Sequence, residues 1–175
     1  MAARVETELK FHLPRPAPIR RRLRALGFTV QRPRAREQNW IYGHSRASLL
    51  RLRHTGDRWL LTAKGPRLPG PLKRRQEIEI EVADGPALRK LLALALGEAM
   101  SYSRHRTVYT HAGERGEIAW DETPFGVYME IEGSAAWVRR TAAALGLSLA
   151  QAEPRSYPEI FDRRGAPSGF GTRPA

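Results

Sequence analysis

The segment Gln76–Val82 constrains the fold of this 175-residue chain most strongly, because glutamate alternates with apolar residues along it. Glu77, Glu79 and Glu81 occupy every second position, and Ile or Val follows each of them. A period of two is typical of a β-strand, in which residues two apart share one face and lie about 7 Å from each other. The segment therefore predicts a strand with an acidic face and an apolar face.

Four other predicted strands also carry charges of one sign on a single face. The pairs are Glu6 with Glu8, Arg51 with Arg53, Arg104 with Arg106, and Glu130 with Glu132. One such strand alone is explained by the solvated face of an antiparallel sheet. Like charges repel at close range, however, so five strands that each carry charges of one sign indicate that an external compensator, a bound ligand of opposite charge, neutralises them. Metal cations would compensate the carboxylates, and phosphates would compensate the arginines.

Turn residues divide the chain into short strands and three amphipathic helices. The predicted strands span residues 5–13, 37–43, 48–54, 59–64, 76–82, 102–111, 117–121 and 127–132. Residues 65–73 are rich in Pro, Gly and basic side chains, which predicts a loop. The predicted helices span 19–26, 88–96 and 134–145, and each ends at a glycine.

The three helices could cover the apolar strand faces from outside, and the charged faces would then point inward. A closed barrel of about eight strands has room for side chains or one slim ligand. We therefore expect an α+β fold, an eight-stranded antiparallel closed β-barrel that forms a tunnel, with helices packed outside. We expect one tunnel domain at residues 1–162 and a flexible C-terminal tail at 163–175, which is rich in Gly and Pro.

The composition favours an anionic partner. Lys and Arg total 30 against 18 Asp and Glu, a formal net charge of +12, which suits nucleic acid, an anionic membrane or a small polyanion, although solubility alone explains it equally well. The chain has no Cys, which excludes disulfides, zinc–thiolate sites and cysteine nucleophiles. It has neither a leader-like segment nor an apolar stretch as long as a membrane span, so we expect a cytoplasmic protein without a membrane partner.

Several short motifs follow one another in a fixed order along the chain. They are Glu6-x-Glu8-x-Lys10, Leu50-Arg51-x-Arg53, Lys64-Gly65-Pro66, Arg75-x-Glu77-x-Glu79-x-Glu81, Arg104-x-Arg106, the run from Asp121 to Gly126, Glu130-x-Glu132 and Ser156-Tyr157. In this order they resemble the CYTH domain, also called the triphosphate tunnel metalloenzymes, over residues 5–161. The resemblance implies an eight-stranded antiparallel tunnel, a triphosphate-containing substrate, and Mg²⁺ or Mn²⁺ as cofactor.

The resemblance also implies roles for individual residues. The implied metal ligands are Glu6, Glu8, Glu130 and Glu132, and the carboxylates expected to support metal, water or neighbouring basic side chains are Glu77, Glu79, Glu81 and Asp121. The side chains expected to bind phosphate are Lys10, Arg51, Arg53, Lys64, Arg104 and Arg106. Lys64, together with Glu6 and Glu8, is expected to be catalytic, with Lys64 positioning or activating water. Arg104 departs from the Lys that is frequent in the family.

Three functions remain open at this point. We expect a metal-dependent triphosphatase acting on inorganic triphosphate, thiamine triphosphate or a nucleoside triphosphate, as a monomer or homodimer. A class IV adenylyl cyclase, which makes cyclic AMP and pyrophosphate from ATP, would use the same tunnel. A non-catalytic module that binds polyphosphate or RNA would explain the basic helix at Arg20–Arg24, although a solvated helix face explains it too. The four Trp residues are expected in the core or at the rim, with base stacking as the alternative.

Overall fold

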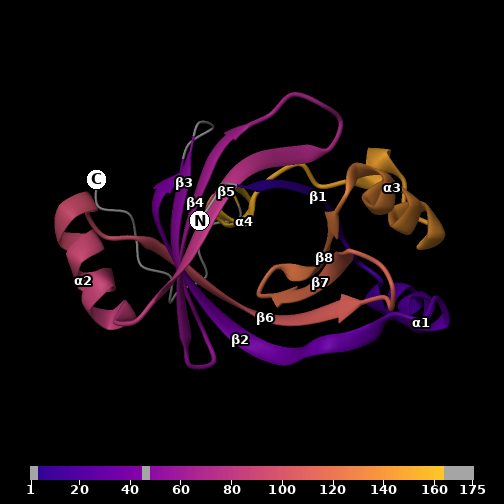
Figure 1. Ribbon diagram of the computed structural model, residues 1–175, viewed down its shortest axis with the longest axis horizontal. Helices are drawn as coiled ribbons and strands as arrows, with labels where there is room; N and C mark the ends of the chain where they lie inside the picture. The colour runs from indigo at the N-terminus through magenta and orange to yellow at the C-terminus, as the bar shows by residue number, and fades with distance from the viewer. Residues whose placement is uncertain (1–3, 45–47, 164–175) are drawn as a thin grey trace.

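The computed structural model describes residues 4–44 and 48–163 (Figure 1). Its strands are β1 (Arg4–His12), β2 (Thr29–His44), β3 (Leu49–Thr55), β4 (Arg58–Arg67), β5 (Lys73–Val82), β6 (Met100–Thr110), β7 (Gly116–Thr123) and β8 (Gly126–Gly133). Its helices are α1 (Pro16–Ala25), α2 (Gly85–Leu96), α3 (Ala135–Ala144) and α4 (Tyr157–Arg163), with a 3₁₀ turn at Leu149–Gln151.

The strands close into a single antiparallel barrel in the order β1-β5-β4-β3-β2-β6-β7-β8, and β8 pairs back onto β1. The predicted eight-stranded antiparallel barrel is therefore confirmed. Since successive side chains on a strand point to opposite faces, the barrel divides each strand into an inward and an outward set. Glu8 faces Glu132, and Lys10 faces Glu130, across the β1–β8 pair.

Several strands are longer than the sequence predicts. β2 begins at Thr29 instead of residue 37, and its pairing with β6 shifts register on both sides of Arg32. Bulges of this kind interrupt the alternation of side chains between the two faces of a strand. Pro33 also lacks the N–H group that strand residues use for pairing, so the sequence pattern did not predict a strand at residues 29–36. The predicted loop at 65–73 is wrong at both ends, because β4 continues to Arg67 through another register shift and β5 already begins at Lys73.

Helices α1 and α3 lie at one end of the molecule, and α2 lies at the other (Figure 1). Leu23 of α1 and Val138 of α3 are fully buried and belong to one core with Phe11 and Ile131 of the barrel wall. At the other end, the side chain of Asp84 caps α2 by accepting a hydrogen bond from the backbone N–H of Ala87 at 2.9 Å. The three predicted helices are therefore present, with bounds close to the predicted ones.

The helices do not cover the whole barrel. Ile78 and Ile80 of β5 are 46% and 44% exposed, although they belong to the apolar face that the sequence pattern identified. The expectation that helices shield this face is wrong for β5, because α1 and α3 pack near the β1–β8 side while α2 contacts β2 and β3.

Helix α4 packs its aromatic side chains against a second core. Tyr157 and Phe161 lie there with Tyr102 of β6 and Tyr128 of β8. The predicted tail at 163–175 overlaps α4 at Arg163, and residues 164–175 fall outside the described residues. No helix in the described ranges has both the length and the apolar character needed to cross a membrane.

Candidate functional site

The barrel encloses an elongated cavity of about 1040 Å³. Inward side chains from all eight strands line it, including Glu6 on β1, Glu37 on β2, Lys64 on β4 and Glu130 on β8. Eleven Lys or Arg side chains and nine Glu side chains take part in the lining. The lining is therefore highly charged but nearly neutral in sum.

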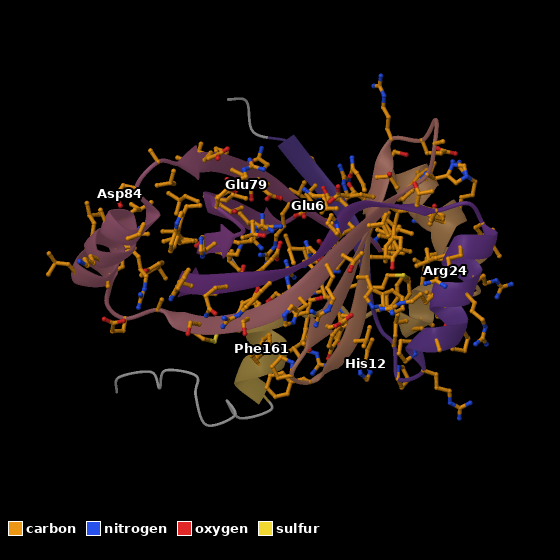
Figure 2. The ribbon with its side chains drawn as sticks, turned by 90° about the horizontal axis from the view of Figure 1, so that it is seen from below. Glu6, His12, Arg24, Glu79, Asp84 and Phe161 are labelled. Carbon is orange, nitrogen blue, oxygen red and sulfur yellow. The ribbon has the colours of Figure 1, made fainter. Side chains whose placement is uncertain are left out.

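Most of the residues predicted to form the site lie on this cavity. The twelve that line it are Glu6, Glu8, Lys10, Arg51, Arg53, Lys64, Glu77, Glu79, Arg104, Arg106, Glu130 and Glu132. They come from six strands that are distant in the sequence, and only closure of the barrel brings them together. Figure 2 shows Glu6 and Glu79 near the middle of the barrel, between the helices at its two ends.

Two predicted carboxylates lie elsewhere. The side chain of Glu81 is 57% exposed and pairs with Arg58 at 2.9 Å, so it does not line the cavity. Asp121 is fully buried beneath the lining, where it accepts hydrogen bonds from Arg104 at 3.0 Å and from Arg106 at 2.6 Å. Of the supporting roles expected for Asp121, the geometry matches the support of basic side chains.

Neighbouring strands compensate one another's charges. Lys64 on β4 lies opposite Glu77 on β5, and Lys10 on β1 lies opposite Glu130 on β8. Ion pairs also reach across strands that are not neighbours, since Lys64 Nζ lies 2.5 Å from Glu6 Oε2. The inference that the segregated charges need an external compensator is wrong for this reason, because glutamates of the lining form ion pairs with lysines and arginines from other strands of the barrel.

The implied metal ligands are themselves held by lysine and arginine side chains. Lys64 binds Glu6 and Lys73 binds Glu8, each at 2.5 Å, while Glu130 accepts from Arg106 at 2.5 Å. No three Asp, Glu or His side chains within residues 4–44 and 48–163 are gathered into a metal-binding cluster. The donor chemistry nevertheless fits Mg²⁺ or Mn²⁺, since Glu8 and Glu132 face each other on paired strands and supply carboxylate oxygens.

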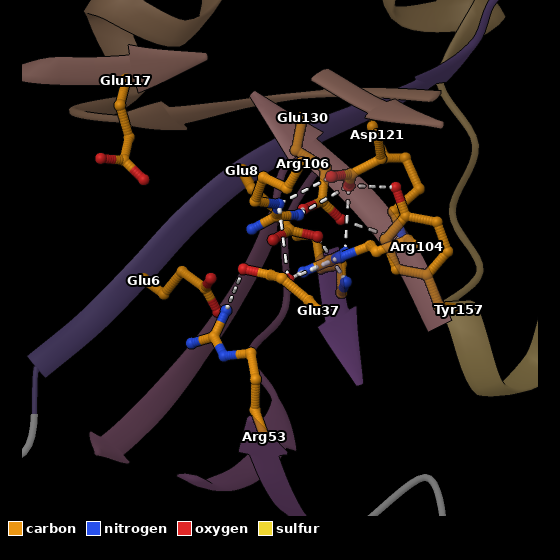
Figure 3. A network of polar contacts seen from close by, with 12 residues as sticks. Glu6, Glu8, Glu37, Arg53, Arg104, Arg106, Glu117, Asp121, Glu130 and Tyr157 are labelled. Atoms are coloured by element: carbon orange, nitrogen blue, oxygen red, sulfur yellow. Dashed lines mark hydrogen bonds and ion pairs between the residues drawn. The ribbon is translucent and has the colours of Figure 1, made fainter. Parts of the chain in front are cut away.

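A network of polar contacts joins arginines of the cavity to buried carboxylates (Figure 3). Arg104 donates to Glu37 at 2.8 Å and to Asp121 at 3.0 Å, and Arg106 donates to both Asp121 and Glu130. Burial alone would raise the pKa of Glu37, but Arg104, Arg106 and Arg53 outweigh it and hold that pKa well below its usual range. Glu37 is therefore ionised at neutral pH and fixes the positions of these guanidinium groups.

Tyr157 joins this network from helix α4, and its side chain also lines the cavity. Its hydroxyl donates to Asp121 Oδ2 at 2.5 Å, and its ring lies 3.7 Å from Lys10 Nζ and 4.9 Å from the guanidinium carbon of Arg104. Burial, followed by the Asp121 charge, raises the pKa of Tyr157 well above its usual value. The phenol therefore keeps its proton and remains a hydrogen-bond donor to Asp121.

The two lysines with predicted roles differ in their electrostatics. Burial lowers the pKa of Lys10 to about 8, and the nearby Glu130 carboxylate offsets part of that effect. Burial also acts to lower the pKa of Lys64, but Glu6 and Glu8 outweigh it and raise the pKa above its ordinary value. Lys64 is therefore an ammonium group at neutral pH, which suits binding of phosphate and positioning of water better than removal of a proton.

Sequence reasoning missed several residues of the site. Lys73 and Arg75 line the cavity and share the inward parity of Glu77, so extending the strand by three residues would have found them. Glu37 gave no usable signal, because a single glutamate at the predicted start of a strand has no visible partner. Tyr157 stood out in a motif with Ser156, but nothing in the sequence connected it with Asp121.

Comparison with known proteins agrees with this architecture. The sequence pattern of the CYTH domain matches residues 4–157, which is most of the chain and includes all eight strands. The chain belongs to the CYTH domain family. A Methanocaldococcus jannaschii protein provisionally named an adenylate cyclase is 25% identical over 136 residues, which cover 74% of this chain and 77% of that protein.

Solved structures share the CYTH fold. A protein of Vibrio parahaemolyticus provisionally named an adenylate cyclase superposes with a TM-score of 0.77 at 19% identity, covering 92% of this chain and 99% of that one. A Hippeastrum protein provisionally named an adenylyl cyclase, and described as having a dominant triphosphatase activity, superposes with a TM-score of 0.66 at 16% identity, covering 93% of this chain and 98% of that one. These likenesses establish the shared fold.

Proposed function

We propose that this CYTH protein is a metal-dependent hydrolase of triphosphate-containing substrates, namely inorganic triphosphate, thiamine triphosphate or a nucleoside triphosphate. The observation that carries the proposal is the convergence of six predicted phosphate-binding side chains and six glutamates on one cavity. A volume of about 1040 Å³ lies at the upper end of typical ligand pockets, which span about 300–1,000 Å³. The cavity is therefore large enough to take the whole substrate.

The phosphate chain would bind along the arginines and lysines. Arg51, Arg53 and Lys64 retain 12–13% side-chain exposure and face the cavity, so they are accessible to an entering anion. Arg104 retains 1% exposure and is tied to Glu37 and Asp121, so it acts mainly by holding its surroundings in place. Guanidinium groups bind phosphate oxygens with two parallel hydrogen bonds, which fixes the orientation of the chain.

The carboxylates Glu6, Glu8, Glu130 and Glu132 would hold the Mg²⁺ or Mn²⁺ ions. When bound, such an ion neutralises phosphate charge and polarises the phosphorus–oxygen bonds. Lys64 and Lys73 would then leave Glu6 and Glu8, and their ammonium groups would be free to bind phosphate oxygens. The same lysines would thus form ion pairs with the glutamates before the substrate binds and with its phosphates afterwards.

Hydrolysis follows from positioning and charge neutralisation, as in phosphoryl transfer generally. The water oxygen forms a bond to the terminal phosphorus, the bond from that phosphorus to the bridging oxygen breaks, and a proton is released to solvent. Lys64 would donate hydrogen bonds to the terminal phosphate, while Arg53 and Arg106 would stabilise charge on the departing oxygen. Arg53 and Arg106 are already fixed by Glu37, Glu79 and Asp121, so these two side chains need little reorganisation.

Adenylyl cyclase activity is the second candidate function, and the names of the similar proteins favour it. A cyclase needs a place for adenine in addition to the triphosphate. Tyr102 and Tyr157 are the aromatic side chains among the residues that line the cavity, and both pack in the second core, with Tyr102 stacked on Phe161 at 4.6 Å. Within residues 4–44 and 48–163, the lining thus offers adenine no available stacking partner, which favours hydrolysis over cyclisation.

A non-catalytic polyphosphate- or RNA-binding tunnel is the third candidate. Such a module would gain nothing from nine glutamates beside its basic side chains, since they weaken the attraction of an anion. The mixed lining suits a substrate that enters together with cations.

One experiment separates these functions. The protein is incubated with tripolyphosphate, thiamine triphosphate or ATP, in Mg²⁺, Mn²⁺ or EDTA, and both orthophosphate and cyclic AMP are measured. Metal-dependent release of orthophosphate without cyclic AMP supports the proposal. Cyclic AMP with stoichiometric pyrophosphate would replace it with the cyclase, and binding without turnover in either metal would replace it with the non-catalytic module.

A further inference from the structure

The tunnel does not account for the net charge of the protein. Its lining holds eleven basic and nine acidic side chains, whereas the whole chain carries a formal charge of +12. Most of the excess therefore belongs to residues outside the tunnel lining. Helix α1 concentrates it, with the arginines Arg20, Arg21, Arg22 and Arg24 and no acidic residue in ten positions. Figure 2 shows Arg24 on this helix, at the end of the molecule opposite Asp84 of the α2 cap.

Little on the protein neutralises these arginines. Arg20 pairs with Glu122 at 3.5 Å, and Glu122 also pairs with Arg34 of β2 at 2.9 Å. Throughout residues 4–44 and 48–163, no ion pair is found for Arg21 or Arg24. Unpaired like charges on adjacent helical turns repel one another, and a polyanion at this surface would remove that repulsion.

A pocket of about 330 Å³ opens beside the same arginines, between α1 and β7. Ala17, Arg20, Arg21 and Arg24 line it from α1, and Trp120 and Glu122 line it from β7. The guanidinium carbon of Arg20 lies 4.6 Å from the centroid of the Trp120 ring. The Nε of Arg20 and the Nε1 of Trp120 are buried, and neither finds a hydrogen-bond partner in the described part of the chain.

We propose that this surface of α1 binds single-stranded nucleic acid, with phosphates on Arg21 and Arg24 and one base in the pocket beside Arg20. Arginine suits this role because it pairs with phosphate through two hydrogen bonds and stacks on flat rings. A base also presents a flat ring to the pocket beside Arg20, which a bare phosphate chain lacks. The pocket is of the size that holds small ligands.

A membrane surface fits these observations less well. Peripheral membrane helices insert large apolar side chains beside their basic residues. The apolar side chains of α1 instead face the barrel, where Leu23 is fully buried and Ile19 packs against the same core. Inorganic polyphosphate would use the arginines but has no group for the pocket.

Fluorescence anisotropy with labelled oligonucleotides tests the proposal. The probes are 12-residue single strands of RNA and of DNA, each with a 5′-hydroxyl so that the tunnel has no triphosphate to bind, and EDTA is present throughout. Arg21→Gln with Arg24→Gln should weaken binding about tenfold at 100 mM salt and make the slope of log K against log salt less steep by about 1.4, or about 0.7 for each lost phosphate contact. The charge-matched control, Arg74→Gln with Lys90→Gln, should stay within about twofold of the unchanged protein.

Ala17→Leu isolates the pocket, because it enlarges a lining side chain without changing any charge. It should weaken oligonucleotide binding about fivefold, a loss within the range of one stacked base, and leave binding of inorganic polyphosphate unchanged. Equal losses in the two charge-matched double variants would overturn the proposal, since they would indicate attraction by net charge alone. No effect of Ala17→Leu, or binding confined to polyphosphate or to phosphatidylserine vesicles, would overturn it as well.

This inference is independent of the tunnel reaction. Arg21 and Arg24 lie outside the tunnel lining, so the double variant should retain metal-dependent phosphate release from tripolyphosphate at the unchanged rate. Loss of nucleic-acid binding with retained hydrolysis is therefore the expected pattern.

Discussion

The hydroxyl of Tyr157 donates a hydrogen bond to Asp121, and that carboxylate in turn accepts hydrogen bonds from Arg104 and Arg106. A residue of the short C-terminal helix α4 thus contacts the carboxylate that holds two arginines of the cavity. The position of α4 and the orientation of these arginines are therefore linked.

Tyr157→Phe should loosen this link while keeping the ring against Lys10. Loss of a hydrogen bond to a charged group costs about 2 kcal/mol, which corresponds to a melting temperature lower by about 5 °C for a chain of this size. We expect a severalfold lower kcat with a smaller change in KM, measured together with thermal unfolding. An unchanged kcat in a folded variant would show that the hydroxyl does not position the arginines.

Glu8→Gln should abolish metal-dependent hydrolysis without unfolding the protein. It removes a carboxylate charge at a buried position that Lys73 contacts, and its cost should exceed the roughly 10–100-fold loss typical of an outer-shell partner of a metal. The measurement is phosphate release across a titration of Mg²⁺ or Mn²⁺, with circular dichroism to verify folding.

Glu81→Gln is the matched control for Glu8→Gln. It makes the same chemical change on a glutamate that is exposed, pairs with Arg58 and lies outside the cavity. Its activity should stay near that of the unchanged protein, because exposed ion pairs contribute about 0–1 kcal/mol. Full activity of Glu8→Gln, or comparable losses in both variants, would contradict the assignment of Glu8 as a metal ligand.

Glu37→Gln should destabilise the protein in a pH-dependent way. The pKa of Glu37 is depressed in the folded state, so its stabilising contribution is complete above the unfolded value of about 4.3 and declines as the pH falls through the folded value. At pH 7 we expect a loss of about 3 kcal/mol, as for other broken buried ion pairs. Urea unfolding of both proteins between pH 7 and pH 3 should show the difference shrinking below about pH 4. A difference that grows toward acid pH would refute the assigned charge state.

Arg104→Lys restores the residue that is frequent in the family and tests whether this chain depends on the guanidinium. Arg104 bonds to Glu37 through one nitrogen and to Asp121 through another, which a single ammonium group cannot reproduce in the same geometry. We expect a stability loss of about 2 kcal/mol and a lower kcat. Higher activity than the unchanged protein would instead indicate that Lys is the better group for catalysis.

The sequence could predict those residues of the site that alternate strictly with outward-facing residues along a strand. Glu77 and Glu79 on β5, or Arg104 and Arg106 on β6, define an inward face without any knowledge of their neighbours, because a strand has a period of two. Glu81 shows the limit of this rule. The period of two predicts which face of the strand a residue occupies, but not where along the strand the cavity ends. The pairing between strands could not be predicted from the sequence either, because the registers of β1 with β5 and with β8 depend on how the barrel closes.

The compensation of charge inside the barrel illustrates the same limit. In the sequence, β1 carries two glutamates on one face, and β3 and β6 each carry two arginines on one face. Each of these pairs needs partners of opposite charge. Their partners lie on strands far away in the chain, as with Arg53 and Glu79 at 2.8 Å. Only the order of strands around the barrel reveals that these groups satisfy one another.

A lumen whose own charges cancel exchanges partners when it is filled. A phosphate chain that entered without cations would pair with the arginines and leave the glutamates without counterions. Cations that entered alone would pair with the glutamates and leave the arginines without counterions. A complex of the two replaces both sets at once and preserves electroneutrality at every stage. In the proposed triphosphatase, the ion pairs of the barrel would therefore favour joint entry of metal and triphosphate, and we expect occupancy to rise steeply only when both are present.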